Sequence, residues 1–159
     1  TRRPAAGLNS RRTGVPMTHR LFMIDDNPGD IELVTEALRE GGSKVSIATA
    51  ADGDEALAEL AALGTVGADQ LPDLILLDLN MIKVQGQEVL HRIKADPLLR
   101  CIPVVVYTSS QAAADIDCSY RDGAAAYLIK PLSFDELVRL MKTLAAFWFT
   151  AVALPRGGR

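Results

Sequence analysis

The chain has 159 residues, 48% hydrophobic and 23% charged, which predicts one ordinary domain with tails and an extensive core. Its formal net charge is −3, and an acidic domain of this kind argues against nucleic-acid binding, which depends on neutralising phosphates. The longest apolar stretch, residues 144–154, is too short to span a bilayer, so we predict a cytoplasmic protein without membrane contact.

The ends of the chain differ from its middle. Residues 1–16 hold four arginines and no acid, and we interpret them as a basic, disordered leader. We assign residues 17–154 to one domain with an extended C-terminal helix, and residues 155–159 to a tail. Cys101 and Cys118 lack metal-ligand or CxxC spacing, which fits a reducing compartment.

Short apolar runs alternate with helical patterns along this domain. The runs that predict strands are residues 21–24, 45–48, 74–77, 104–106 and 126–129. Helix starts are predicted at Asn27-Pro28, at Asp52 with Glu55, and at Ser133 with Glu136, with further helices after Gly86 and near residues 111–121 and a loop at 64–72. This order predicts an α/β fold: a doubly wound, five-stranded parallel sheet with helices on both faces.

Polar residues follow four of the five predicted strands. They are Asp25-Asp26, Asp78, Thr108 and Lys130, in chain order. Parallel strands end at one edge of a sheet, where ligands bind, so we expect these groups to meet. Two carboxylates about 4 Å apart repel by about 4 kcal/mol near a protein surface, and Mg²⁺ would offset that repulsion. With an ammonium and a hydroxyl beside them, the pattern favours aspartyl-phosphate chemistry.

The combined pattern resembles the bacterial response regulator receiver domain, which has a flavodoxin-like fold. The resemblance covers about residues 20 to 145 and lies in Asp25-Asp26, the run from Leu76 to Met81, Thr108, and the run from Tyr127 to Pro131. It implies a phosphoryl group from a histidine kinase on Asp78. The chain would then be a phosphoacceptor that assists its own phosphorylation and dephosphorylation, not an enzyme.

The resemblance also implies the role of each site residue. Asp26, Asp78 and the Asn80 carbonyl would bind Mg²⁺, and Asp25 would act through water. Thr108 and Lys130 would contact the phosphoryl group, and Thr108 and Tyr127 would move on activation. It further implies a cis bond between Lys130 and Pro131.

The chain departs from the family pattern in the loop after the predicted phosphoacceptor. Ile82 stands where the family usually has Pro, and Gln85 stands where it usually has Asp before the glycine. Ser109 is bulkier than the residue that usually follows the threonine. None of these departures removes a group that the chemistry requires.

The C-terminal helix carries more apolar residues than one domain needs. We interpret Phe147, Trp148 and Phe149 as a patch that pairs two chains, against the alternative that they lie on the domain's own surface. The Phe-Trp-Phe ending resembles small receivers that serve bacterial phytochrome kinases, which makes such a kinase the expected partner.

Two other functions remain open at this point. A binding-only pseudo-receiver would lack one of the acids or the lysine, and this chain has them all. An aspartyl-phosphate phosphatase would need a second acid two residues after the nucleophile, where this chain has Asn80.

Overall fold

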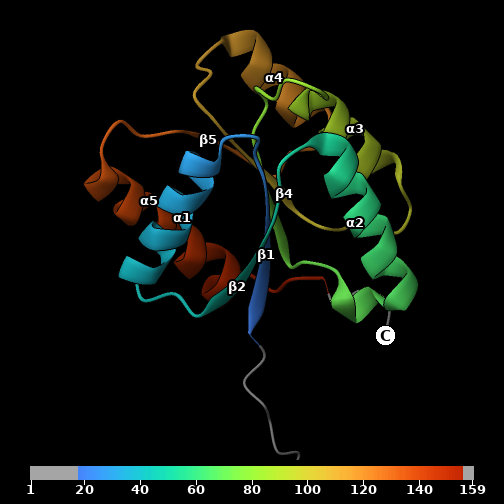
Figure 1. Ribbon diagram of the computed structural model, residues 1–159, viewed down its shortest axis with the longest axis horizontal. Helices are drawn as coiled ribbons and strands as arrows, with labels where there is room; N and C mark the ends of the chain where they lie inside the picture. The colour runs from blue at the N-terminus through green and yellow to red at the C-terminus, as the bar shows by residue number, and fades with distance from the viewer. Residues whose placement is uncertain (1–17, 156–159) are drawn as a thin grey trace, which may run out of the picture.

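The computed structural model describes residues 18–155, in which five parallel strands form a single sheet flanked by helices (Figure 1). The strands, in the spatial order β2-β1-β3-β4-β5, are β1 (His19–Ile24), β2 (Val45–Ala50), β3 (Leu74–Leu77), β4 (Val104–Thr108) and β5 (Ala126–Ile129). The helices are α1 (Pro28–Glu40), α2 (Gly53–Val66), η1 (Ala68–Gln70), α3 (Gly86–Ala95), α4 (Ala113–Arg121), α5 (Phe134–Ala146) and η2 (Phe147–Ala151). The predicted fold class is confirmed, whereas the predicted leader lies outside the described residues.

Helices cover both faces of the sheet, as Figure 1 shows, with α1 and α5 on one face and α2 and α3 on the other. Alternate residues of β1 point to opposite layers: Leu21 and Met23 pack with α1 and α5, and Phe22 and Ile24 pack with α2 and α3. Strands β3 and β4 are buried along their whole length, as strands covered on both faces must be.

The predicted helix starts are confirmed at three N-caps. The side chains of Asn27, Asp52 and Ser133 accept hydrogen bonds from backbone N–H groups in the first turns of α1, α2 and α5. The predicted loop at 64–72 is wrong at its start, because α2 continues to Val66. Gly64 lies within this helix against Leu98, so its missing side chain makes room for packing instead of ending the helix.

Helix α3 begins without a side-chain cap. Gln85 occupies the N-cap position in an extended conformation, and its side chain makes no capping hydrogen bond. We expect Gln85→Ser to stabilise the domain by about 1 kcal/mol relative to Gln85→Ala, because a serine hydroxyl accepts from a first-turn N–H and alanine does not. Urea unfolding of the two variants measures this difference, and equal midpoints would contradict it.

A π-helical turn, η2, follows α5 directly. Phe149 stacks on His19 at the start of β1, with the ring centroids 4.9 Å apart, while Phe147 is 54% exposed. Trp148 and Phe149 both pack against the core beneath α1 and α5. The expected patch is therefore only partly exposed, because Phe149 is held on the domain's own sheet. None of the helices in residues 18–155 is long and apolar enough to cross a membrane.

Candidate functional site

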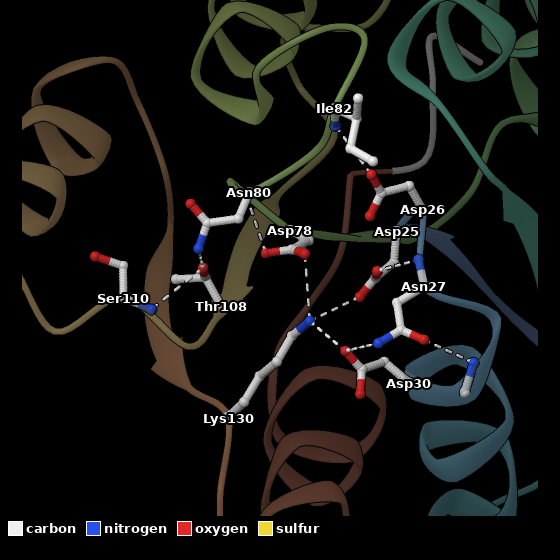
Figure 2. Close-up of polar contacts among 11 residues, drawn as sticks. Asp25, Asp26, Asn27, Asp30, Asp78, Asn80, Ile82, Thr108, Ser110 and Lys130 are labelled. Carbon is white, nitrogen blue, oxygen red and sulfur yellow. Dashed lines mark hydrogen bonds and ion pairs between the residues drawn. The ribbon is translucent and has the colours of Figure 1, made fainter.

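The polar side chains predicted to meet at the carboxyl edge of the sheet do lie together (Figure 2). Asp25 follows β1, Asp78 follows β3, Thr108 ends β4 and Lys130 follows β5. Because β1 lies between β2 and β3, the chain leaves β2 at the sheet's edge and returns to the middle. This reversal of strand order opens the crevice in which doubly wound folds bind ligands.

Three carboxylates form the acidic part of the site. Single oxygen atoms of Asp25, Asp26 and Asp78 lie within 4.8 Å of one another. Asp25 is fully buried and Asp78 is 5% exposed, while Asp26 is intermediate. Burial raises the pKa of Asp25, and hydrogen bonds from Lys130 and the Asn27 backbone act against that rise.

Backbone N–H groups hold each of these carboxylates. Asp25 Oδ1 accepts from the N–H of Asn27 at 2.9 Å, and Asp78 Oδ1 accepts from that of Asn80 at 3.2 Å. Asp26 Oδ2 accepts from the N–H of Ile82 at 2.9 Å (Figure 2). A proline at position 82 has no N–H to donate, so this departure from the family pattern adds a hydrogen bond to the acidic cluster.

Lys130 supplies the positive charge of the site. Its Nζ lies 2.9 Å from Asp25 Oδ2, 2.7 Å from Asp30 Oδ2 and 3.3 Å from Asp78 Oδ2. Burial alone would lower the pKa of this lysine, but the bonds to Asp30 and Asp25 outweigh burial and raise it, so the ammonium stays charged. The ring of Tyr107 lies below it, with the centroid 5.4 Å from Nζ.

Thr108 lies on the opposite side of Asp78 from Asp30 (Figure 2). Its Oγ1 accepts from Asn80 Nδ2 at 3.2 Å and from the N–H of Ser110 at 3.4 Å. Both bonds use the lone pairs of the hydroxyl and leave its proton for another acceptor. Tyr127 does not reach this group, because its hydroxyl donates to the Ser110 carbonyl at 3.0 Å.

The donor set fits a hard divalent cation. Mg²⁺ prefers carboxylate and carbonyl oxygens together with water, and Asp25, Asp26 and Asp78 present three carboxylates on one edge.

The expected cis bond between Lys130 and Pro131 is wrong, because this bond is trans here. The two isomers of a bond before proline differ by only about 0.5–1 kcal/mol, so the residue type alone does not fix the isomer.

Asp30 is the residue of the site that the sequence analysis did not single out as functional. It lies in the first turn of α1 and makes the shortest contact to Lys130, 100 positions away. In the sequence it reads as an ordinary first-turn acid of a helix. Its position soon after Asp26 in the sequence could have indicated a role in the site, because the first turn of α1 starts at the same sheet edge as Asp25 and Asp26.

Comparison with known proteins identifies the arrangement. Residues 21–142 match the family model of the response regulator receiver domain. The chain belongs to this family. The receiver domain is 36% identical over 135 residues to response regulator Rcp1 of Synechocystis sp., and the alignment covers 85% of this chain and 92% of Rcp1.

Solved structures agree with this assignment. The phosphorylated cyanobacterial phytochrome response regulator RcpA is 37% identical, with a TM-score of 0.78, covering 87% of this chain and 99% of RcpA. The Mn²⁺-bound form of Rcp1 is 35% identical, with a TM-score of 0.73, covering 86% of this chain and 99% of Rcp1. One relative has thus been seen phosphorylated and another with a divalent metal, and this receiver domain carries an acidic cluster of its own.

The excess negative charge of the site has a measurable consequence. Within residues 18–155, the ion pairs of Asp25, Asp30 and Asp78 all go to Lys130, and Asp26 lies beside Asp25 and Asp78. We expect Asp26→Asn to stabilise the metal-free protein by about 1 kcal/mol, because it removes repulsion while keeping an oxygen that accepts from the loop N–H.

The same variant should lose most of the stabilisation that Mg²⁺ gives the wild type, since binding to the native state raises its stability. Thermal unfolding in EDTA and in Mg²⁺ measures both effects. The matched control is Asp117→Asn on the exposed face of α4, which should change neither. Equal Mg²⁺ stabilisation of wild type and Asp26→Asn would exclude Asp26 as a ligand.

Proposed function

We propose that this receiver domain accepts a phosphoryl group on Asp78 from a histidine kinase in a reaction that requires Mg²⁺. The single observation that carries the proposal is the placement of Asp78. This carboxylate lies at the carboxyl end of the buried strand β3, between two further acids, the ammonium of Lys130 and the hydroxyl of Thr108. A role in packing alone would not gather three carboxylates around one ammonium.

The side chains divide the work of the transfer. Asp78 Oδ attacks phosphorus and forms an oxygen–phosphorus bond, while the phosphorus–nitrogen bond of the donor histidine breaks and its electron pair stays on the imidazole. Lys130 would contact one phosphoryl oxygen, and the free proton of Thr108 would be donated to another. When bound by Asp26, Asp78 and the Asn80 carbonyl, with Asp25 acting through water, Mg²⁺ would neutralise charge on the phosphoryl oxygens.

The same groups would also support hydrolysis of the phosphoryl group from Asp78. Water attacking phosphorus would release inorganic phosphate and restore the Asp78 carboxylate. The charge that collects on the phosphoryl oxygens is similar in both reactions, so Lys130 and Thr108 would assist both. In this sense the domain would assist its own phosphorylation and dephosphorylation.

The proposed donor is a bacteriophytochrome kinase. The proposal is supported by the 37% identity to a phytochrome response regulator, 99% of which aligns with this chain. A phosphorylated Asp78 would carry about −1.5 to −2 charges next to Lys130 and Thr108 in place of the carboxylate's single charge. This extra charge would favour a rearrangement of the loop that the Tyr127–Ser110 hydrogen bond holds.

We also propose a homodimer in which the exposed Phe147 contributes to the contact. Support comes from the exposed ring of Phe147, which packs edge-on to Trp148 in the apolar segment after α5, because contiguous apolar patches mark association surfaces. Sedimentation equilibrium of wild type and Phe147→Ser tests the contact. A monomeric wild type at tens of micromolar would exclude the dimer.

The labelling experiment uses acetyl phosphate as donor. We expect intact-protein mass spectrometry to find one added phosphoryl group in Mg²⁺ and none in EDTA, and peptide mapping to place it on Asp78. Labelling that is independent of metal, or absent under both conditions, would contradict the proposed function and favour a binding-only module.

A further inference from the structure

Lys130 has more carboxylate partners than its proposed task requires. An ammonium has three N–H donors, and here all three are directed at carboxylates: those of Asp25, Asp30 and Asp78. The contact to Asp30 Oδ2, 2.7 Å, is the shortest, and the contact to Asp78 Oδ2, 3.3 Å, is the longest. The ammonium is therefore held closer to α1 than to the proposed phosphoacceptor, as Figure 2 shows.

The carboxylate of Asp30 is fixed in this position by its own surroundings. Asp30 lies in the first turn of α1, where the helix dipole favours a negative charge. Asn27 Nδ2 donates to the same oxygen, Oδ2, at 3.2 Å, while Asn27 Oδ1 caps the helix by accepting from the Gly29 N–H (Figure 2). The side chain of Asp30 is 28% exposed, so it is partly screened by solvent but has a defined direction.

Asp30 and a phosphoryl group on Asp78 would compete for the same hydrogen-bond donors, the N–H groups of Lys130. The phosphoryl oxygens carry more charge than the Asp78 carboxylate and would attract Nζ away from α1. Asp30 opposes this movement because it binds Nζ directly. Asp25 is buried on the sheet side and makes a 2.9 Å contact, so it can retain Lys130 in the site without Asp30.

We propose that Asp30 is a positioning residue that competes with the phosphoryl group for Lys130 and thereby slows phosphorylation of Asp78. This inference rests on the proposed function and adds to it a residue that restrains the reaction. Asp30→Asn keeps the size of the side chain and the amide oxygen that can accept from Asn27, but it loses the charge that attracts Nζ. The transferring phosphoryl group would then have a freer ammonium available.

The test measures the second-order rate constant for labelling of Asp78 by acetyl phosphate in Mg²⁺. We expect Asp30→Asn to raise this rate constant about two- to fivefold, the range that corresponds to breaking a partly exposed ion pair. Asp30→Glu keeps a carboxylate at this position, so its rate constant should stay close to the wild-type value. Glu32→Gln, which removes the same charge from an exposed position on α1, should leave it unchanged.

Two further variants separate an effect through Lys130 from direct repulsion. In the Lys130→Met background the substitution Asp30→Asn should no longer change the rate constant, since the ammonium through which Asp30 acts is gone. The unfolding free energies of wild type, both single variants and the double variant, measured by urea in EDTA, form a cycle that is independent of phosphorylation. Non-additivity in this cycle is expected, because the two side chains are paired in the metal-free protein.

The outcomes are distinguishable. A wild type that is labelled on Asp78 with an Asp30→Asn rate constant equal to or below it would overturn the role of Asp30 and leave the proposed function intact. An increase that persists in the Lys130→Met background would assign the effect to repulsion of the donor and would also overturn the role. A wild type that is not labelled would overturn both.

Discussion

Replacing Asp78 with Asn should reduce phosphoryl incorporation to background without unfolding the domain. The amide has no carboxylate oxygen to attack phosphorus, yet it matches Asp in size and retains an oxygen that accepts from the Asn80 N–H. The substitution also removes one of the carboxylates that crowd Lys130, so the metal-free variant should be at least as stable as the wild type.

The measurement is intact-protein mass after incubation with acetyl phosphate and Mg²⁺. Urea unfolding in EDTA shows that a loss of labelling does not come from a loss of folding. Asp117→Asn, on the exposed face of α4, controls for the change of net charge and should be labelled like the wild type. Retained labelling of Asp78→Asn would move the acceptor to one of the neighbouring acids.

Gly86→Ala should destabilise the domain by about 3 kcal/mol, near the upper end of the range for overpacking a buried site. A Cβ at this position would lie 2.1 Å from the Asp78 carbonyl oxygen and 2.6 Å from Leu79 Cα. Both are backbone atoms, so no flexible side chain can move aside. Helix propensity alone would predict that Gly86→Ala raises the unfolding free energy, since alanine in a helix is favoured over glycine by about 1 kcal/mol. The clash with the backbone reverses that expectation.

Urea unfolding of Gly86→Ala and of the neighbouring Gln85→Ala measures this cost. Gln85 is exposed, so its truncation should change the unfolding free energy by no more than about 0.5 kcal/mol. The backbone shift that accommodates Gly86→Ala would also displace Asp78, so Mg²⁺ should stabilise this variant less than the wild type. An unchanged stability would show that the loop between β3 and α3 yields easily.

Local signals explain why most of the fold was predictable. Asn27, Asp52 and Ser133 cap their helices through bonds within three residues, so the sequence around each of them contains the whole interaction. The strands read as apolar runs because the sheet is covered on both faces. The meeting of Asp25, Asp78 and Lys130 follows from the parallel direction of the strands, which the alternation with helices already implied.

The features that sequence reasoning missed depend on contacts between distant residues. Asp30 meets Lys130 across 100 positions, and the direction of its side chain is set by the turn at Asn27, which residue types alone do not define. Phe149 was interpreted as part of a patch that pairs two chains, but it stacks on His19 at the start of β1. Gly64 was predicted to begin a loop, and its close contact with Leu98, in the turn after α3, explains why a glycine lies within α2.

The burial of Asp78 limits the shape of any donor that can reach it. The carboxylate is 5% exposed and lies at the ends of the strands, below the loops that leave β1, β3 and β5. A phosphoryl group delivered by a partner protein would therefore enter along the direction of the strands, carried on a side chain that projects from a convex surface such as the outside of a helix. A phosphohistidine seated at the bottom of a cleft would be excluded by contact between the two backbones before its phosphorus came within bonding distance.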